Sequence, residues 1–237
     1  MRVLITGANR GIGRALYDGY VARGDDVIAT TRNQASDGWL QLDVTDPASV
    51  SAMANQLKGE AIDLLICNAG VYLDKGNELG NGYTSNVWAD TFAANVTGVF
   101  LTIEALLSNL RAVGGKVAII SSQMGSSERS GGNAFAYRAS KAAALNLGRN
   151  LAVDLSPDVA VGIYHPGWVQ TDMGGAKADI TVDESSSGLL RRFDLLGPDT
   201  TGCFEMWKAR RCPTDTPSFQ TKGTVRAKRL ETVRATL

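Results

Sequence analysis

The sequence predicts an α/β fold, a doubly wound parallel sheet of the Rossmann type, in a single domain. Strand-like and helix-like segments alternate from residue 2 to about residue 165. The strand-like segments include short continuous apolar runs, such as Val117-Ala118-Ile119-Ile120, which suit strands covered on both faces. The first strand leads into a glycine-rich turn and a helix pattern, and repeated units of this kind build a parallel sheet.

The first half of the chain is expected to form two complete βα units and a short extra strand. Pro47 suits the first turn of the second helix, where its missing N–H is not needed. In chain order the expected elements are strand Arg2–Thr6, helix Gly11–Arg23, strand Asp26–Thr31, strand Trp39–Leu42 and helix Asp46–Leu57.

The second half repeats the pattern with longer helices. Ser156-Pro157 ends the last of these helices. The expected elements are strand Ile62–Cys67, helix Asn86–Arg111, strand Lys116–Ser121, helix Ala134–Leu155 and strand Val159–Tyr164. Glycine- and serine-rich loops follow the strands at the edge where such sheets bind ligands, namely Gly76–Ser85, Ser121–Asn133 and Gly167–Gly188.

The composition is that of an ordinary globular protein. A chain of 237 residues with 44% hydrophobic residues and 24 residues of each charge sign can bury one large core. No apolar run approaches the roughly 20 residues that a membrane helix needs, and Met1-Arg2 leads straight into a strand. Cys67, Cys203 and Cys212 lack metal-ligand spacing, so we expect reduced thiols, no metal and a cytoplasmic location. The single histidine, His165, excludes most histidine-based triads, and a structural or cofactor-lining role is favoured over a catalytic one.

The charge is unevenly distributed along the chain. Residues 208–237 carry eight Lys or Arg and two acids, a net charge of +6, which leaves −6 on residues 1–207. We therefore expect residues 1–207 to form one domain, and 208–237 to be a basic tail, disordered or of artificial origin. A nucleic-acid-binding or membrane-binding tail is the alternative. Because the tail lacks interleaved aromatic residues and an amphipathic stripe, we expect no nucleic-acid or membrane partner.

The glycine turn is the candidate cofactor site. Gly7, Gly11 and Gly13 follow the spacing G-x3-G-x-G, which can supply a tight turn, close approach of a pyrophosphate and close packing of helix on strand. Asp43-Val44 ends the third strand, where a carboxylate can meet an adenine amino group, and Asn68-Ala69-Gly70 ends the fourth. A glycine-rich turn that binds nothing, or a plain Asn-Ala-Gly turn, remains the alternative for either motif taken alone.

Two arginines bear on which nicotinamide cofactor is bound. An NAD site usually has an acid about 20 residues past the glycines, but the second strand here ends in Arg32, and Arg10 lies inside the turn. Two guanidiniums favour a ribose 2′-phosphate by charge and by bidentate hydrogen bonding, although either arginine alone would read as a solvated surface residue. We expect NADP(H), with NAD(H) as the other candidate.

Tyr137 and Lys141 are the candidate catalytic pair. They are one helical turn apart, so the ammonium would favour the phenolate and lower the pKa of Tyr137 from its usual value near 10. Tyr137 would then act as general acid in reduction and as base in oxidation. Ser122, or its neighbour Ser121, would donate to the substrate oxygen, and Asn95 would hold a water that relays protons to Lys141. The alternatives are a surface Tyr–Lys pair, loop serines and a buried structural amide.

Taken together, these segments resemble the short-chain dehydrogenase/reductase family. The matching segments are Thr6–Gly13, Asp43-Val44, Asn68-Ala69-Gly70, Asn95, Ser122, Tyr137–Lys141 and Pro166–Thr171. The resemblance implies that residues 1–207 form a dinucleotide-binding and catalytic domain. It also implies a catalytic tetrad of Asn95, Ser122, Tyr137 and Lys141. The cofactor-binding residues that it implies are Gly7, Asn9, Arg10, Gly11, Ile12, Gly13, Arg32, Asp43, Val44, Asn68, Ala69, Gly70, Tyr137, Lys141, Pro166, Gly167, Val169 and Thr171.

The segment His165–Gly175 is most similar to the C-factor and sniffer-like carbonyl reductase branch of that family. Two departures stand out. Ser122 and Tyr137 lie fifteen residues apart, about two more than is usual in the family, with the extra residues around Ser126–Ser130. The basic tail matches no family segment.

The expected activity is NADPH-dependent interconversion of an aldehyde or ketone and its alcohol, with a small-molecule carbonyl or alcohol as substrate. The alternatives are an NADPH-binding regulator without catalysis, and an epimerase or dehydratase with the same Tyr–Lys chemistry. Tyr72–Ser85, the loop after Ser122 and Met173–Leu196 are expected to wall the substrate pocket. The last of these is also expected to fold over the bound cofactor as a lid. The resemblance also implies a homodimer or homotetramer built on the two long helices.

Overall fold

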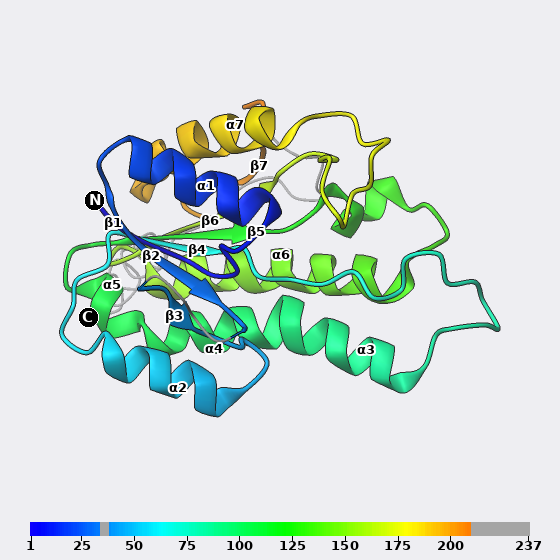
Figure 1. The fold of residues 1–237 in the computed structure, drawn as a ribbon, viewed down its shortest axis with the longest axis horizontal. Helices are drawn as coiled ribbons and strands as arrows, with labels where there is room; N and C mark the ends of the chain where they lie inside the picture. Colours follow the sequence, from blue (N-terminus) through cyan, green and yellow to red (C-terminus); the bar gives the residue numbers. More distant parts are fainter. Residues whose placement is uncertain (34–37, 210–237) are drawn as a thin grey trace, which may run out of the picture.

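The computed structural model describes residues 1–33 and 38–209. Its centre is a sheet of seven parallel strands in the order β3-β2-β1-β4-β5-β6-β7 (Figure 1). The strands are β1 Arg2–Ile5, β2 Asp26–Thr31, β3 Leu40–Gln41, β4 Leu64–Cys67, β5 Lys116–Ile120, β6 Ala160–His165 and β7 Phe204–Met206.

The chain reverses its direction of travel across the sheet between β1 and β4. Ile5 pairs with Ile66 in register, so the turn after β1 and the loop after β4 emerge side by side. Such a switch point is where open α/β sheets form a crevice at the carboxyl ends of their strands. The fold therefore places the glycine turn and Asn68-Ala69-Gly70 against each other.

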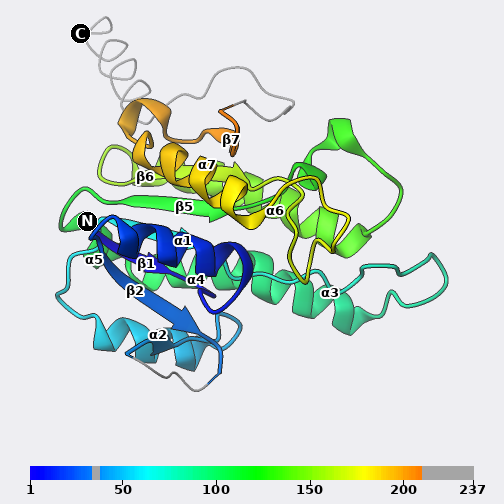
Figure 2. The ribbon, with the colours of Figure 1, turned by 45° about the horizontal axis from the view of Figure 1, so that its top comes forward.

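Helices cover both faces of the sheet. α1 Gly11–Ala22 and α7 Val182–Asp194 lie on one face, and α2 Pro47–Gln56, α4 Gly98–Ala105 and α6 Phe135–Leu155 lie on the other (Figures 1 and 2). α3 Ser85–Phe92 and α5 Leu107–Arg111 continue the α4 layer at its two ends. The arrangement is the three-layer α/β fold that the sequence predicts.

The core divides between the two faces because successive side chains of a strand point in opposite directions. Leu4 of β1 and Leu65 of β4 pack in the cluster with α2, α4 and α6, whereas their neighbours Ile5 and Ile66 pack with α1 and α7. The strands are thus apolar on both sides, which explains their continuous apolar runs.

Three elements differ from the sequence-based expectation. The helix expected at Asn86–Arg111 is divided into α3, a π-helical segment Ala93–Thr97, α4 and α5. α7 begins inside the stretch expected to be loop, because Thr181 and Glu184 form a capping box that starts a helix at Val182. β7 is a short edge strand that pairs with β6, and it is not among the strands expected from the apolar runs. The other elements match the expected ones to within two residues.

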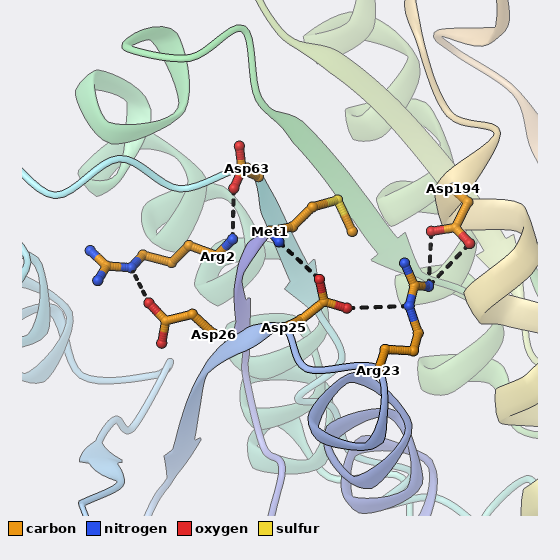
Figure 3. Close-up of polar contacts among 7 residues, drawn as sticks. All are labelled: Met1, Arg2, Arg23, Asp25, Asp26, Asp63 and Asp194. Atoms are coloured by element: carbon orange, nitrogen blue, oxygen red, sulfur yellow. Dashed lines mark hydrogen bonds and ion pairs between the residues drawn. The ribbon is translucent and has the colours of Figure 1, made fainter.

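Charged groups form a network of ion pairs at the amino-terminal edge of the sheet (Figure 3). The α-amino group of Met1 lies 2.8 Å from Asp25 Oδ1, and Arg23 Nε lies 3.2 Å from Asp25 Oδ2. Arg23 also bridges the end of α1 to Asp194 at the end of α7, with Nη1 at 3.1 Å from both carboxylate oxygens. This network ties β1, β2, α1 and α7 together at the edge opposite the crevice.

Within residues 1–33 and 38–209, no helix is both long and apolar enough to cross a bilayer. The same residues contain no group of three or more His, Cys, Asp or Glu side chains placed to hold a metal ion. The expected basic tail lies outside the described residues from position 210 onward, as does Cys212.

Candidate active site

A cleft of about 940 Å³ opens at the carboxyl edge of the sheet. Residues from the ends of β1, β2, β4 and β5 line it, together with α6 and the segment between β6 and α7. The expected site residues among its walls are Gly7, Asn9, Arg10, Gly11, Ile12, Gly13, Arg32, Asp43, Val44, Asn68, Ala69, Gly70, Tyr137, Lys141, Pro166 and Thr171. Motifs that are widely separated in the sequence are therefore gathered around one cavity.

The glycine turn is held in shape by Asn68. The Asn68 amide donates 3.0 Å hydrogen bonds to the carbonyl oxygens of Thr6 and Gly7. A Cβ atom at position 13 would collide with the Gly7 carbonyl oxygen and would lie 2.5 Å from the Asn68 amide nitrogen, so only glycine fits there. Asn68 thus acts on the turn through its side chain, an effect that the spacing of the motif alone does not predict.

The first turn of α1 presents free backbone donors to the cleft. Its N-cap residue Arg10 makes no side-chain capping hydrogen bond, and no acidic residue lies in the first turn. An uncapped helix start with the positive end of the helix dipole suits an anionic group.

Arg10, Arg32 and Asp43 form the charged end of the cleft. Hydrogen bonds from the hydroxyl and the backbone N–H of Thr45, at 2.7 and 2.9 Å, lower the pKa of Asp43, and the charge of Arg32 adds to this. Arg10 Nη1 lies 3.0 Å from Asp172 Oδ2. Arg32 and Arg10 both line the cleft, and Arg10 has a carboxylate partner that the sequence does not predict.

Tyr137 lies in the first turn of α6 with only 8% of its surface exposed. Burial raises the pKa of Tyr137 to about 12, the hydrogen bond with Ser122 acts in the opposite direction, and nearby Tyr72 and Asp74 raise it further. The ring of Tyr72 stacks on that of Tyr137 with centroids 4.3 Å apart. The expectation of a lowered pKa is therefore wrong for this structure, because burial outweighs the opposing effect of the hydrogen bond with Ser122.

Lys141 is buried beside Tyr137, with 6% of its surface exposed. Its Nζ donates a 3.0 Å hydrogen bond to the carbonyl oxygen of Ile120 and lies 5.7 Å from the centroid of the Tyr137 ring. Burial lowers the pKa of Lys141 to about 8. Burial thus favours the neutral form of both the phenol and the amine.

The two serines after β5 have different partners. The Ser121 hydroxyl donates to the Lys141 carbonyl oxygen at 3.0 Å and is buried, whereas the Ser122 side chain is the hydrogen-bond partner of Tyr137. Ser122 Oγ also accepts from the Met124 N–H at 3.1 Å. Ser121 is among the residues that line the cleft and Ser122 is not, but only Ser122 is hydrogen-bonded to Tyr137. The contact with Tyr137 favours Ser122 as the hydroxyl next to the reacting group.

The extra loop residues fold into two 3-10 turns, Gln123–Gly125 and Ser127–Arg129. Arg138, the residue after Tyr137, holds both turns by donating to the carbonyl oxygens of Met124 and Arg129 at 3.3 and 2.8 Å. The longer spacing between Ser122 and Tyr137 is thus absorbed without separating the two side chains. We did not single out Arg138 from the sequence, although its place beside Tyr137 is a signal.

Asn95 lies in the π-helical segment and is 1% exposed. Its Oδ1 accepts from the Val71 N–H at 2.8 Å, and its Nδ2 donates to the Val71 carbonyl at 2.9 Å and to Ser140 Oγ at 3.0 Å. The amide therefore joins the exit of β4 to α6. The water relay that we expected for Asn95 stays a prediction.

The segment after β6 borders the other side of the cleft. Thr171 packs against the turn at Gly11, and Val169 is buried and forms a bridge with Ile180. At Gly167, with φ +94°, a Cβ would lie 2.9 Å from Trp207 Nε1. Gly167 and Val169, which we expected to bind the cofactor, are not among the residues that line the cleft.

His165 precedes this segment and is 4% exposed. Neither ring nitrogen has a hydrogen-bond partner among the described residues, and burial lowers the pKa of His165 to about 4. It is absent from the cleft lining, which agrees with a structural role.

Comparison with known proteins adds to this geometry. Residues 1–180 match the family model described as short chain dehydrogenase. A 1-hydroxy-2-glutathionyl-2-methyl-3-butene dehydrogenase of Rhodococcus sp. (strain AD45) is 35% identical over 219 residues, covering 86% of this chain and 95% of that protein. The C-signal protein of Myxococcus xanthus is 38% identical over 165 residues, covering 68% of this chain and 98% of that protein.

Among solved structures, the NADPH-bound carbonyl reductase from chicken fatty liver aligns with a TM-score of 0.81 and 31% identity. The alignment covers 89% of this chain and 97% of that chain.

Proposed function

The chain belongs to the short-chain dehydrogenase family, and from that premise we propose that it is an NADP(H)-dependent oxidoreductase that interconverts a carbonyl compound and its alcohol. The observation that supports the proposal is that Tyr137 and Lys141 line the cleft beside the glycine turn, with the Ser122 side chain hydrogen-bonded to Tyr137.

The cleft fits a dinucleotide. The uncapped first turn of α1 and the glycine turn supply backbone donors for a pyrophosphate, and Asp43 lies at the end of the sheet where an adenine would sit. Arg10 and Arg32 border the same end and offer guanidinium groups to a ribose 2′-phosphate. The carbonyl reductase from chicken fatty liver is an NADPH-bound structure, which supports NADP(H) over NAD(H).

Once bound, the reduced cofactor would supply a hydride for the carbonyl carbon. The chain would supply the proton: the Tyr137 hydroxyl donates it to the carbonyl oxygen, and Ser122 orients the same oxygen by a second hydrogen bond. With its pKa raised to about 12, Tyr137 keeps its proton at neutral pH, as a general acid must. The charged form of Lys141 would stabilise the phenolate that remains.

The substrate side of the cleft is apolar. Val71, Leu73 and Met173 line it, and Leu73 and Met173 are 44% and 41% exposed. Such a rim favours a carbonyl compound with an apolar substituent over a charged one.

The test is an NADPH-oxidation screen against small aldehydes, ketones and quinones, with NADH in parallel, comparing wild type with Tyr137→Phe. We expect Tyr137→Phe to lower kcat by at least about a hundredfold, because the general acid is lost. It should still bind NADPH with an unchanged Kd, measured by fluorescence titration.

Tyr83→Phe is the matched control, since its hydroxyl donates to the nearby Asn77 carbonyl oxygen and its side chain does not line the cleft. A Tyr137→Phe enzyme with near-normal turnover would refute the proposal.

A second candidate is an NADPH-binding regulator without turnover. The observation in its favour is the 38% identical relative named C-signal. Tight NADPH binding with no consumption across the whole carbonyl panel would support this candidate over the first.

A further inference from the structure

The catalytic helix α6 begins without a cap of its own. Its N-cap residue is Ala134, which has no side-chain acceptor and adopts left-handed backbone angles of φ 52° and ψ 46°. The first N–H groups of a helix have no partner within the helix, and leaving them unpaired in a buried place is costly. The first turn includes Tyr137, so any loosening of this helix start would move the proposed general acid.

Asp74 supplies the missing cap from another part of the chain. Its Oδ2 accepts the Ala136 N–H at 2.8 Å, and its two carboxylate oxygens lie 3.3 and 3.4 Å from the Tyr137 nitrogen. Asp74 is 1% exposed and comes 62 residues before Ala136. A carboxylate at this end of a 21-residue helix also interacts favourably with the helix dipole.

The neighbours of Asp74 contact the same site. Val71 exchanges two hydrogen bonds with the Asn95 amide, and Tyr72 stacks on the ring of Tyr137. Lys75 Nζ donates to the carbonyl oxygen of Met173, a residue of the cleft lining, at 2.9 Å. Residues 71–75 therefore hold Tyr137 at its backbone and at its ring simultaneously, which an ordinary helix cap does not do.

We propose that Asp74 is a positioning residue for the reaction, which fixes the Tyr137 hydroxyl by binding the backbone of the first turn of α6. The proposal rests on the proposed function of Tyr137 as general acid. Misplacing a reacting group by about 1 Å can lower a rate by about a hundredfold, so a cap at this place controls turnover as well as stability.

The experiment compares Asp74→Ala and Asp74→Asn with Asp46→Ala. Asp46 caps α2 through the Ala48 N–H at 2.9 Å and does not line the cleft, so it is a matched control for the loss of a helix cap. We expect Asp74→Ala to lower kcat at least tenfold with the NADPH Kd within twofold of wild type. Asp46→Ala should leave kcat within twofold, even though its Tm falls. Asp74→Asn keeps an acceptor oxygen and should recover most of the lost kcat.

A second measurement is the titration of the Tyr137 phenol itself. The titratable and charged groups that face Tyr137 are Tyr72 and Asp74 from the segment 71–75 and Lys141 from α6, with Arg138 near Tyr72. The negative charge of Asp74 raises the pKa of Tyr137, so Asp74→Asn should shift the titration of Tyr137 to lower pH. The titration is measured by NMR of ¹³C-labelled tyrosine, with Tyr137→Phe to assign the signal.

The proposal is overturned if Asp74→Ala loses no more kcat than Asp46→Ala, or if the Tyr137 titration is the same in Asp74→Asn and wild type. If the wild-type protein reduces no carbonyl compound, the proposed function fails separately. The NMR titration then still decides whether Asp74 acts on Tyr137.

Discussion

Arg10 and Asp172 form an ion pair at the edge of the cofactor cleft, with 3.0 Å between Nη1 and Oδ2. Both side chains line the cleft, and they are 74% and 80% exposed. The guanidinium that we propose for the 2′-phosphate of NADPH therefore already has an anionic partner, and a bound phosphate must compete with it.

Asp172→Asn should raise the affinity for NADPH. An exposed ion pair contributes about 0.2–1 kcal/mol, so removing the competing carboxylate should lower the KM for NADPH by up to about fivefold. The KM for NADH should not change, because NADH has no 2′-phosphate. Steady-state kinetics with both cofactors test this, with Asp18→Asn, which breaks the Arg14 pair on α1, as control. An equal effect on both cofactors would contradict the assigned role of Arg10.

The rate of carbonyl reduction should fall as the pH rises through about 8. Lys141, whose pKa burial lowers to about 8, is charged below that pH and neutral above it, whereas Tyr137 keeps its proton throughout this range. Loss of the ammonium removes the charge that stabilises the phenolate. The measurement is kcat/KM for reduction from pH 6 to 10.

The Lys141→Arg variant tests whether the titration of Lys141 causes this fall in the rate. A guanidinium stays charged over the whole range, so the falling limb should move above pH 10 even if the overall rate drops. A limb that stays near pH 8 in this variant would show that another group is responsible.

We propose that α4 and α6 carry the subunit interface, and Phe100→Arg should then disrupt the oligomer. Phe100, Leu147 and Leu151 border a groove of about 420 Å³ on the outer surface of these helices. A charge placed in a buried apolar contact has no partner and opposes association. The molar mass, measured by light scattering after gel filtration, should fall to that of the monomer. Val21→Arg, at an exposed apolar residue of α1 on the other face of the sheet, should leave the mass unchanged.

Arg23→Ala should destabilise the fold without affecting catalysis. The change removes the ion pairs of Arg23 with Asp25 and Asp194 at the edge opposite the cleft, and we expect a loss of about 1 kcal/mol in the free energy of unfolding (Figure 3). Urea unfolding measures this, and kcat should equal that of wild type. A loss of kcat in the folded variant would contradict this, because it would mean that the ion pairs at the amino-terminal edge of the sheet affect the cleft at the carboxyl edge.

The sequence predicts most of the fold because its signals are local. Apolar runs mark the strands, Pro47 marks a helix start, and the glycine spacing marks the turn after β1. The start of α7 was also available from the sequence, since Thr181 and Glu184 have the spacing of a capping box. Its serine-rich composition led instead to the expectation of a loop.

The parts of the site that sequence reasoning missed depend on contacts between distant segments. Asp74 follows a turn-like stretch and gives no sign that it binds an N–H group 62 residues further on. From the sequence alone Asp172 is interpreted as an ordinary surface carboxylate, because its contact with Arg10 exists only in the folded chain. The raised pKa of Tyr137 could not be predicted from the i, i+4 spacing, because it comes from burial under Tyr72 and neighbouring elements.

The π-helical segment Ala93–Thr97 sets a limit on how this region can vary. The wide turn contains one residue more than an α-helix would use, which rotates the side chains of α4 by about 100° relative to those of α3. Asn95 consequently faces Val71 and Ser140, while Val99 and Ile103 face the core. A chain shortened by one residue here could form a continuous α-helix. It could then not direct both Asn95 toward the catalytic end and Val99 and Ile103 toward the core beneath the sheet.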